Sequence, residues 1–403
     1  MFKTLNGQYN SFIFSIYRNI VLCTYKILFI LFIAINLRKI ISNKNIFFFK
    51  NKKYFIGNGF GHYCWTSFYL RAQNYEKILI FDFYNHYNQN IYKLFNLETV
   101  KFNFSKKLFF KLGKKNEKQF FNFCIKTVSY FNKNLINSID DLYFFNLNQK
   151  KFFFQEYNKL NYFRRNYFLR LILSKYSMWN NYIFKEKKSL NINKFLNLEF
   201  IEKLNKKFKI NFDPNKKNIV FYHRYKNVSA QYISRKGLKD SKSGSNSMMY
   251  YENLFKYFNK NNYNVSIVGD FSIKDLDFIQ KKYHFNVCKN KDEQIDFFIH
   301  TINNSEYFIG ESGGAADLPL FLKKKILLFN YSTVGEIFPN SIIYPKSYKK
   351  NIEGKTFFMN IEEINEYMIS DNKLKQQLNC NLDLVSIDRL INIVEVFLNN
   401  YDK

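Results

Sequence analysis

The chain has 403 residues, of which 47% are hydrophobic and 20% aromatic. This length suits two or three domains, and the apolar content excludes an intrinsically disordered protein. The formal net charge of +30 is of the kind that attracts nucleic acid or anionic membranes. However, Lys, Asn, Ile, Phe and Tyr are all abundant, as an A/T-rich genome encodes, and no DNA- or RNA-binding motif accompanies the charge. We therefore expect no nucleic-acid partner.

The N-terminal segment, residues 1–45, is unusually apolar. Its central run, Asn19–Leu37, has basic residues on both sides. A membrane-spanning helix needs about 20 mainly apolar residues, and this run reaches that length only by including Lys26, which is costly at the bilayer centre. We expect a membrane-associated apolar helix. A spanning helix, an in-plane helix and a buried core helix remain open.

The second segment, residues 46–212, begins with an α/β pattern. A short apolar run at 54–56 precedes the glycine-rich segment Gly57–His62, and a helical stretch then leads to a buried strand at Lys77–Asp82. Strand, glycine turn, helix and strand in this order are typical of a βαβ unit. From about residue 104 to 211 the pattern is mainly helical, which predicts a helical region in this lobe.

The glycine-rich segment supplies candidate acceptor-side residues, namely Gly59, Gly61 and His62. Because imidazole titrates near neutral pH, His62 is the best-placed proton acceptor. Asp82, at the end of the following strand, is a second candidate base. No acidic residue follows at dinucleotide-binding spacing, which argues against a NAD site.

The third segment, residues 213–403, alternates between apolar strands and amphipathic helices after the turn at Asp213–Lys217. Such alternation predicts a parallel sheet with helices on both faces. The expected strands are Asn218–Tyr222, Asn264–Val268, Glu306–Ile309 and Lys325–Phe329, and the expected helices are Tyr250–Phe258, Ile273–Lys281, Asp292–Ile302, Ala315–Leu322 and Leu384–Leu398. Together the segments predict an α/β protein with two Rossmann-like lobes, a helical insertion and an N-terminal apolar helix.

A small-residue turn follows the strand that ends near Ile309. Ligands bind at the carboxyl ends of parallel strands, and the turn contains Ser312, Gly313 and Gly314 before a helix begins. Free amides at a helix start attract anions, glycine lets the backbone approach a ligand, and a serine hydroxyl can cap the helix or donate to phosphate. The turn therefore predicts a diphosphate site, with an ordinary serine-capped turn as the alternative.

Other polar residues follow the neighbouring strands. His223 and Arg224 come directly after the first strand of this lobe, and a guanidinium suits a diphosphate because its planar fork donates two hydrogen bonds. We expect Arg224 to stabilise a diphosphate as it departs as the leaving group of a reaction. The alternative is a surface arginine beside a packed histidine. Asp270 either binds ribose or base, or caps a helix, and Asn330 is a similar case.

Metal ligands are not expected in this sequence. Asp275-Leu276-Asp277 matches the D-x-D of metal-dependent glycosyltransferases, but it lies in a predicted helix and we interpret it as a solvent-exposed face. His86, His284 and His300 lack Cys or His partners at ligand spacing. The cysteines are scattered and form no C-x-x-C pair, which predicts reduced thiols in a cytosolic compartment: Cys23, Cys64, Cys124, Cys288 and Cys380. We expect no metal and no cofactor.

Several blocks between Ser245 and Asn330 resemble, in order, a family of bacterial glycosyltransferases found among surface-polysaccharide genes. They are Ser245-Asn246 with Tyr250, Asn264–Asp270, Asp296-Phe297-Phe298 and Phe308–Gly313, followed by Pro319 and Asn330. The segment Gly57–His62 is also similar to the family's N-terminal Gly-His element. Two departures are visible: His223 and Arg224 are adjacent where the family has one residue between them, and Glu311 stands where uncharged residues are usual.

The resemblance implies a metal-independent, GT-B-type glycosyltransferase with a nucleotide-sugar donor. Glu311 would then bind ribose hydroxyls, because a carboxylate repels a diphosphate. The implied partners are a nucleotide sugar and a glycan or lipid-linked acceptor at the cytoplasmic face of the bacterial inner membrane. Two alternatives remain: a non-catalytic nucleotide- or glycan-binding protein with the same fold, and a less favoured basic nucleic-acid-binding protein.

Overall fold

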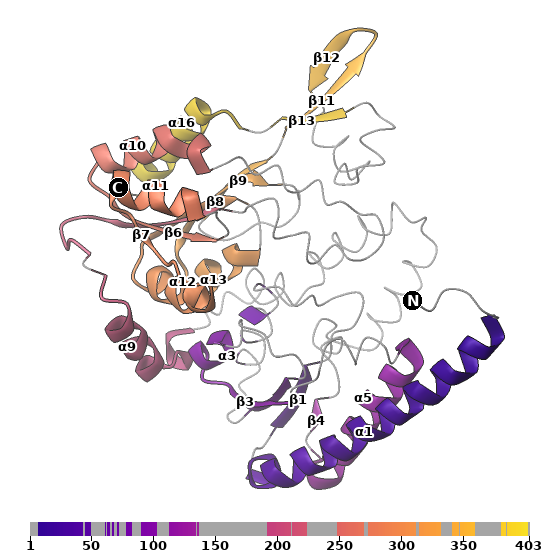
Figure 1. Cartoon of the computed structure of the whole chain (residues 1–403). Helices are drawn as coiled ribbons and strands as arrows, with labels where there is room; N and C mark the ends of the chain where they lie inside the picture. Colours follow the sequence, from indigo (N-terminus) through magenta and orange to yellow (C-terminus); the bar gives the residue numbers. More distant parts are fainter. Residues whose placement is uncertain are drawn as a thin grey trace, which may run out of the picture. The chain divides into compact units, whose positions relative to one another are not determined.

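The computed structural model describes residues 7–42, 45–49, 61, 63–64, 67, 71, 78–82, 90–102, 113–133, 135–136, 192–210, 212–223, 248–269, 273–311, 314–331, 341–345, 347–358, 380–383 and 385–401 (Figure 1). The chain divides into two compact units. Unit 1 comprises residues 1–58 and 66–142, and unit 2 comprises residues 59–65 and 143–403. Unit 2 thus includes a short piece of the N-terminal half, which carries part of the glycine-rich segment.

Unit 1 contains a parallel sheet with strand order β3-β2-β1-β4. The strand expected at Lys77–Asp82 is confirmed as β2, whose buried residues are all apolar. A strand that was not expected, β1, follows the N-terminal helix almost directly, whereas the run at 54–56 lies outside the described residues. The elements of unit 1 are α1 (Gly7–Ser42), β1 (Asn45–Phe49), β2 (Ile78–Asp82), α3 (Asn90–Leu94), β3 (Glu98–Lys101), α5 (Gly113–Phe131) and β4 (Leu135–Ile136).

Unit 2 is built on a second parallel sheet, with strand order β10-β9-β8-β5-β6-β7. All four strands expected from the sequence are confirmed, as β5, β6, β8 and β9. The strands are β5 (Asn218–His223), β6 (Asn264–Gly269), β7 (Asn286–Val287), β8 (Tyr307–Glu311), β9 (Lys325–Tyr331) and β10 (Ser341–Pro345). A separate antiparallel sheet is formed by β11 (Ser347–Ile352), β12 (Lys355–Phe358) and β13 (Cys380–Asp383).

The helices of unit 2 follow the sequence pattern closely. One expected helix, Ala315–Leu322, is shorter in the structure, because its first residues form a 3-10 turn and the α-helical part covers only Asp317–Phe321. The α-helices are α9 (Leu198–Lys207), α10 (Glu252–Lys260), α11 (Ile273–Tyr283), α12 (Gln294–Asn303), α13 (Asp317–Phe321) and α16 (Ile387–Tyr401). Short 3-10 helices are η3 (Ile192–Phe195), η5 (Met248–Tyr251), η6 (Lys291–Glu293) and η7 (Gly314–Ala316).

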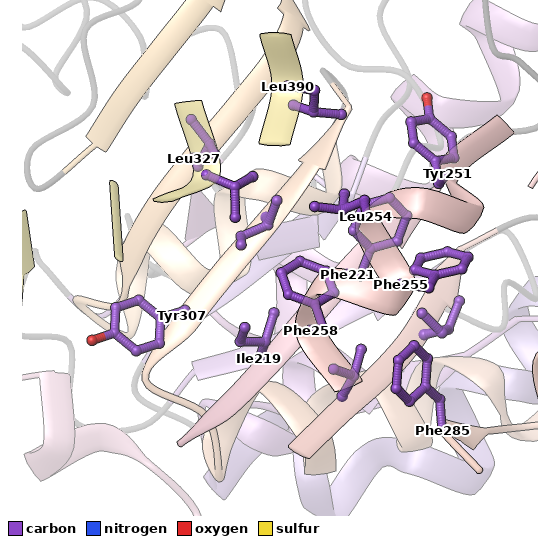
Figure 2. Packing of buried hydrophobic residues seen from close by; sticks show 14 of the residues in the cluster. Ile219, Phe221, Tyr251, Leu254, Phe255, Phe258, Phe285, Tyr307, Leu327 and Leu390 are labelled. Atoms are coloured by element: carbon purple, nitrogen blue, oxygen red, sulfur yellow. The ribbon is translucent and has the colours of Figure 1, made fainter. Parts of the chain in front are cut away.

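Both faces of the central strands in unit 2 are buried. On one face, Phe221, Ile309 and Leu327 pack with Phe255 of α10 and Leu390 of α16 in a single hydrophobic core (Figure 2). On the opposite face, alternate residues of the same strands are also buried, and Phe308 of β8 contacts Phe298 of α12 at 6.3 Å between ring centroids. A parallel sheet covered on both sides needs nearly continuous apolar strands, which is why these strands are easily seen in the sequence.

Candidate functional site

The strand order of unit 2 creates one special position in the sheet. The chain starts at β5, continues outward to β6 and β7, and then returns to the other side of β5 to form β8, β9 and β10. The connections therefore leave β5 and β8 in opposite directions. In open parallel sheets, the crevice at the carboxyl ends of two such strands is where ligands bind. This topological switch point defines the candidate site.

Two predicted donor-binding residues, His223 and Glu311, end the strands at the switch point. Tyr222 of β5 is paired with Gly310 of β8, so the next residue of each strand stands at the same level. Both side chains are buried. The sheet therefore brings together residues that are 88 positions apart in the sequence.

Tyr251 links this polar pair to the core. Its hydroxyl donates a hydrogen bond to Glu311 Oε1 at 2.9 Å, and its ring meets the His223 ring edge-on, with centroids 5.8 Å apart. The same ring packs against Phe221 and Phe329 at 5.3 and 5.8 Å. The Tyr251 hydroxyl thus binds the Glu311 carboxylate, while the Tyr251 ring is part of the hydrophobic core.

The protonation state of Tyr251 follows from this environment. Burial raises its pKa well above the usual value, and the nearby Glu311 carboxylate raises it further because a phenolate would be repelled. Tyr251 therefore stays a hydrogen-bond donor throughout the physiological range. The hydrogen bond also fixes the orientation of one carboxylate oxygen of Glu311.

Glycines allow the backbone to pack closely around the end of β5. A Cβ on Gly310 would lie 2.7 Å from Tyr222 Cβ, so no side chain fits there without movement. Gly269, at the end of β6, has a φ of +110°, and a Cβ there would meet the His223 carbonyl oxygen at 2.0 Å. These glycines let β6 and β8 approach the carboxyl end of β5 more closely than a side chain would allow.

The glycine-rich segment contributes Gly61 to the same part of unit 2. A Cβ on Gly61 would lie 2.9 Å from Gly314 Cα and 2.0 Å from Asp317 Oδ2, and a Cβ on Gly314 would lie 2.9 Å from the Gly61 nitrogen. The two glycines therefore face each other without side chains. Cys64, three residues later, is buried, and its thiol pKa is raised by burial and by Asp317. This thiol is protonated and suited to packing rather than to nucleophilic chemistry.

Asn330 has a defined structural contact. It adopts a left-handed conformation with a φ of +52°, which Asn tolerates better than most residues. Its side-chain oxygen accepts a hydrogen bond from the Val385 amide at 3.1 Å, which ties the end of β9 to the residues before α16. A donor-binding role for Asn330 stays a prediction.

Several predicted site residues lie outside the described residues: Gly59, His62, Arg224, Asp270, Ser312 and Gly313. Asp82 is described only through its backbone, as the last residue of β2 in unit 1. Of the donor-side set, the structure brings together His223 and Glu311 directly, and Arg224 and Ser312 are their immediate neighbours in sequence.

The D-x-D motif was interpreted as a solvent-exposed helix face, and this interpretation is wrong for Asp275. That residue is buried in the first turn of α11, where the helix dipole favours a carboxylate. Asp277 is partly exposed and pairs with Lys289 at 3.6 Å. Across the described part of the chain, no group of three or more His, Cys, Asp or Glu residues is arranged to hold a metal ion.

Two residues of the site were not identified from the sequence. Tyr251 lies in an aromatic stretch at the start of α10, where nothing distinguishes it from a core residue. Asp317 follows two alanines at a helix start and has the pattern of an ordinary first-turn carboxylate. Only the packing of η5 and of Gly61 shows that these side chains lie beside predicted site residues.

Comparisons with known proteins give only distant likenesses. No protein-family model and no curated protein sequence matches the chain. Among solved structures, it is similar to the ADP-heptose LPS heptosyltransferase II of E. coli (11% identity, 89% of this chain and 100% of that chain, TM-score 0.44). It is also similar to a glycosyl transferase family 9 protein of Veillonella parvula (10% identity, 89% and 98%, TM-score 0.47).

A third similar structure is the UDP-GlcNAc 2-epimerase of Neisseria meningitidis (9% identity, 69% and 65%, TM-score 0.25). Likeness at these identities and TM-scores is too distant to assign an activity. The geometry of unit 2 itself shows an α/β fold with a parallel sheet whose switch point lies between β5 and β8.

Proposed function

We propose that this protein is a metal-independent, GT-B-type glycosyltransferase that moves a sugar from a nucleotide diphosphate donor to a lipid-linked or cell-surface glycan. The observation that carries the proposal is the meeting of His223 and Glu311 at the switch point, beside the turn that the sequence predicts to bind a diphosphate. Nucleotides commonly bind at this position of a doubly wound sheet.

The diphosphate would be held by Arg224 and by the backbone amides of Ser312–Gly314. As the sugar leaves, negative charge develops on the terminal phosphate. A guanidinium and preorganised amides stabilise that charge electrostatically, which is the task of the cation in metal-dependent enzymes. His223 precedes Arg224 and is anchored in the sheet, so it would position the arginine rather than contact the reacting atoms.

Glu311 would bind the donor's ribose hydroxyls. A carboxylate accepts several hydrogen bonds, and the bond from Tyr251 orients the Glu311 carboxylate at the edge of the sheet. Hydroxyl groups can donate to such an oriented oxygen, whereas a phosphate would be repelled by it. This places the nucleoside part of the donor toward Glu311 and its diphosphate toward Ser312 in our proposal. Asp270 and Asn330 are further candidates for contacts with the ribose or the base.

The acceptor would lie on the side of the glycine-rich segment, with Gly59, Gly61 and His62 nearest to it. The packing of Gly61 against Gly314 supports this arrangement, since it joins that segment to the donor turn. His62 would take the proton of the acceptor hydroxyl, with Asp82 as the second candidate base. The reaction would take place at the cytoplasmic face of the bacterial inner membrane.

Nucleotide binding to the purified protein tests this proposal. Thermal unfolding is measured with a panel of nucleoside diphosphates and nucleotide sugars without added metal, because a ligand of the folded state raises the melting temperature. We expect one diphosphate nucleotide to stabilise the protein. Arg224→Ala should weaken its binding by about ten- to a hundredfold, since hydrogen bonds to charged groups contribute about 1.5–3 kcal/mol.

The matched control is Lys216→Ala, which also removes one positive charge but lies before β5, at the opposite end of the strand. It should leave nucleotide binding unchanged. Glu311→Gln should weaken binding of ribonucleotides more than that of the corresponding 2′-deoxynucleotides. If Arg224→Ala and Lys216→Ala bind equally well, the proposed diphosphate site is wrong. Binding without sugar transfer would instead identify a non-catalytic nucleotide-binding protein.

A further inference from the structure

Helix α1 has two faces with opposite surroundings. Buried residues recur every three or four positions and therefore lie along one side of the helix: Leu22, Tyr25, Phe29, Ile33 and Ile40. Large apolar side chains on the remaining surface are exposed, and we call six of them the outer stripe: Ile16, Ile20, Ile27, Leu31, Ile35 and Ile41. The described part of the protein therefore buries α1 along one side of the helix.

The buried side of α1 belongs to the core of unit 1. The Phe29 ring is fully buried and contacts Phe102 near β3 at 5.4 Å, Phe120 of α5 at 6.1 Å and Phe81 of β2 at 6.4 Å. The backbone of α1 is also tied to the residue after α5, because the Asn132 side chain donates to the Ile40 carbonyl at 2.9 Å. Helix α1 is thus packed on the sheet and on α5 as part of the unit.

The charges of α1 are all of one sign. The helix contains Arg18, Lys26, Arg38 and Lys39 and no acidic residue. Lys26, which interrupts the apolar run in the sequence, lies with its Nζ 5.4 Å from the centre of the Phe123 ring of α5. It therefore sits at the margin of the helix next to α5 and not within the outer stripe. An exposed apolar stripe accompanied by cations is complementary to an anionic lipid surface.

We propose that α1 lies in the plane of an anionic membrane, with the outer stripe inserted among the lipids, and does not cross the bilayer. By length and composition, the part Ser15–Ser42 would be able to span a membrane. However, a spanning α1 would carry its packed neighbours into the hydrocarbon, including exposed polar residues of α5 such as Gln119, Asn122 and Lys126. Polar and charged groups are costly there, whereas an in-plane helix leaves them in water. This inference does not depend on the glycosyltransferase proposal.

A second copy of the chain is a less favourable partner for the outer stripe than an anionic lipid surface. In a two-fold symmetric interface the same patch meets itself. Two α1 helices, which carry no acidic residue, would then bring their cations close to one interface, although Lys39 of each copy pairs with Glu98 of β3 at 3.2 Å, and such juxtaposition is unfavourable. Anionic lipid headgroups neutralise the same cations.

Vesicle flotation with the full-length protein tests the proposal. We expect binding to vesicles of phosphatidylcholine with phosphatidylglycerol, and much weaker binding to phosphatidylcholine alone. The test variant combines Ile20→Asp, Ile27→Asp and Ile35→Asp, whose native side chains are 59%, 60% and 84% exposed. It should bind at least about a hundredfold more weakly, since three large apolar groups no longer enter the interface and three carboxylates are repelled by it.

The matched control combines Leu198→Asp, Ile352→Asp and Val396→Asp, whose native side chains are 66%, 48% and 55% exposed in unit 2. It changes the net charge and the exposed apolar surface in the same way, and should bind vesicles like the wild type. Equal binding by the two triple variants overturns the proposal. The proposal is also wrong if the protein forms a dimer without lipid and the α1 variant is monomeric but still binds vesicles. The outer stripe would then contact a second copy of the chain.

Protease accessibility separates an in-plane helix from a spanning one. The protein carries a different epitope tag at each end and is examined in inverted inner-membrane vesicles, whose cytoplasmic face is outward. An in-plane α1 leaves both tags open to cleavage without detergent. Protection of the N-terminal tag alone would mean that α1 crosses the bilayer, and the proposal would be wrong.

Discussion

The buried imidazole of His300 makes the stability of unit 2 depend on pH. His300 of α12 packs against two aromatic residues that follow α9. Its ring centroid lies 5.7 Å from that of Phe208 and 6.3 Å from that of Phe212. Its Nδ1 is 2.9 Å from Asn205 Oδ1, so Nδ1–H donates there and the other nitrogen, Nε2, carries the lone pair. Within the described residues, Nε2 has no hydrogen-bond partner. A proton on Nε2 would therefore place an uncompensated charge in an aromatic environment.

Burial lowers the pKa of His300 from 6.5 to about 4. Between these two pH values the unfolded chain binds a proton at this residue and the folded protein does not. The free energy of unfolding therefore falls as the pH falls, starting near pH 6.5 and levelling off near pH 4. At about 1.4 kcal/mol per pKa unit, the total loss at His300 amounts to about 3 kcal/mol.

Urea unfolding of the wild type and of His300→Gln between pH 7 and pH 4 measures this effect. Glutamine can still donate to Asn205 but does not gain a proton in this range. The free energy of unfolding should therefore fall by about 3 kcal/mol less in the variant than in the wild type. The control is His284→Asn, which removes an exposed histidine at a φ of +54° that Asn tolerates. A change in pH dependence that both variants share would not be specific to His300. If the free energy of unfolding depends on pH equally in His300→Gln and the wild type, His300 is not held neutral by burial.

Two further predictions concern the candidate site. Gly61→Ala should lower the melting temperature and abolish nucleotide binding, because the new Cβ would collide with the Gly314 backbone and the Asp317 carboxylate. In the control variant Gly354→Ala, the new Cβ meets nothing within 4 Å, so stability should fall only because of the φ of +78° at that position. Tyr251→Phe should destabilise the protein by about 1 kcal/mol through its lost hydrogen bond and should also weaken nucleotide binding, because Glu311 loses its orientation. Tyr250→Phe loses a comparable hydrogen bond, to the Val385 carbonyl, and should keep full nucleotide affinity, so calorimetric titration of both variants separates the two effects.

The sequence predicted most elements of unit 2 because their signals are local. Strands such as Asn218–His223 and Tyr307–Glu311 are short, continuous apolar runs, as strands covered on both faces must be. The helices between them carry a periodic apolar face. The same reasoning located the ends of these strands and hence His223 as a candidate for a site, whereas Glu311 became a candidate through the family resemblance.

Unit 1 was harder to predict from the same signals. Strand β1 has the sequence Asn-Ile-Phe-Phe-Phe and begins three residues after the last residue of α1, so in the sequence it merges with the apolar N-terminal segment. The short length of α13 was also missed, because a 3-10 turn and an α-helical turn have nearly the same residue preferences. Asp275 is buried although its neighbours Lys274 and Asp277 are exposed or partly exposed, and local charge patterns do not show which way a helix faces.

By itself, then, the sequence determined the α/β class of unit 2, the positions of its main strands and the residue types at their ends. Only the tertiary structure decided that β5 and β8 are neighbours, that Tyr251 reaches Glu311, that Gly61 packs on Gly314 and that one side of α1 is buried. The physical reason is the range of the interactions. Strand and helix propensity depend on neighbours within a few residues, whereas strand order and side-chain contacts depend on how distant segments bury one another's apolar surface.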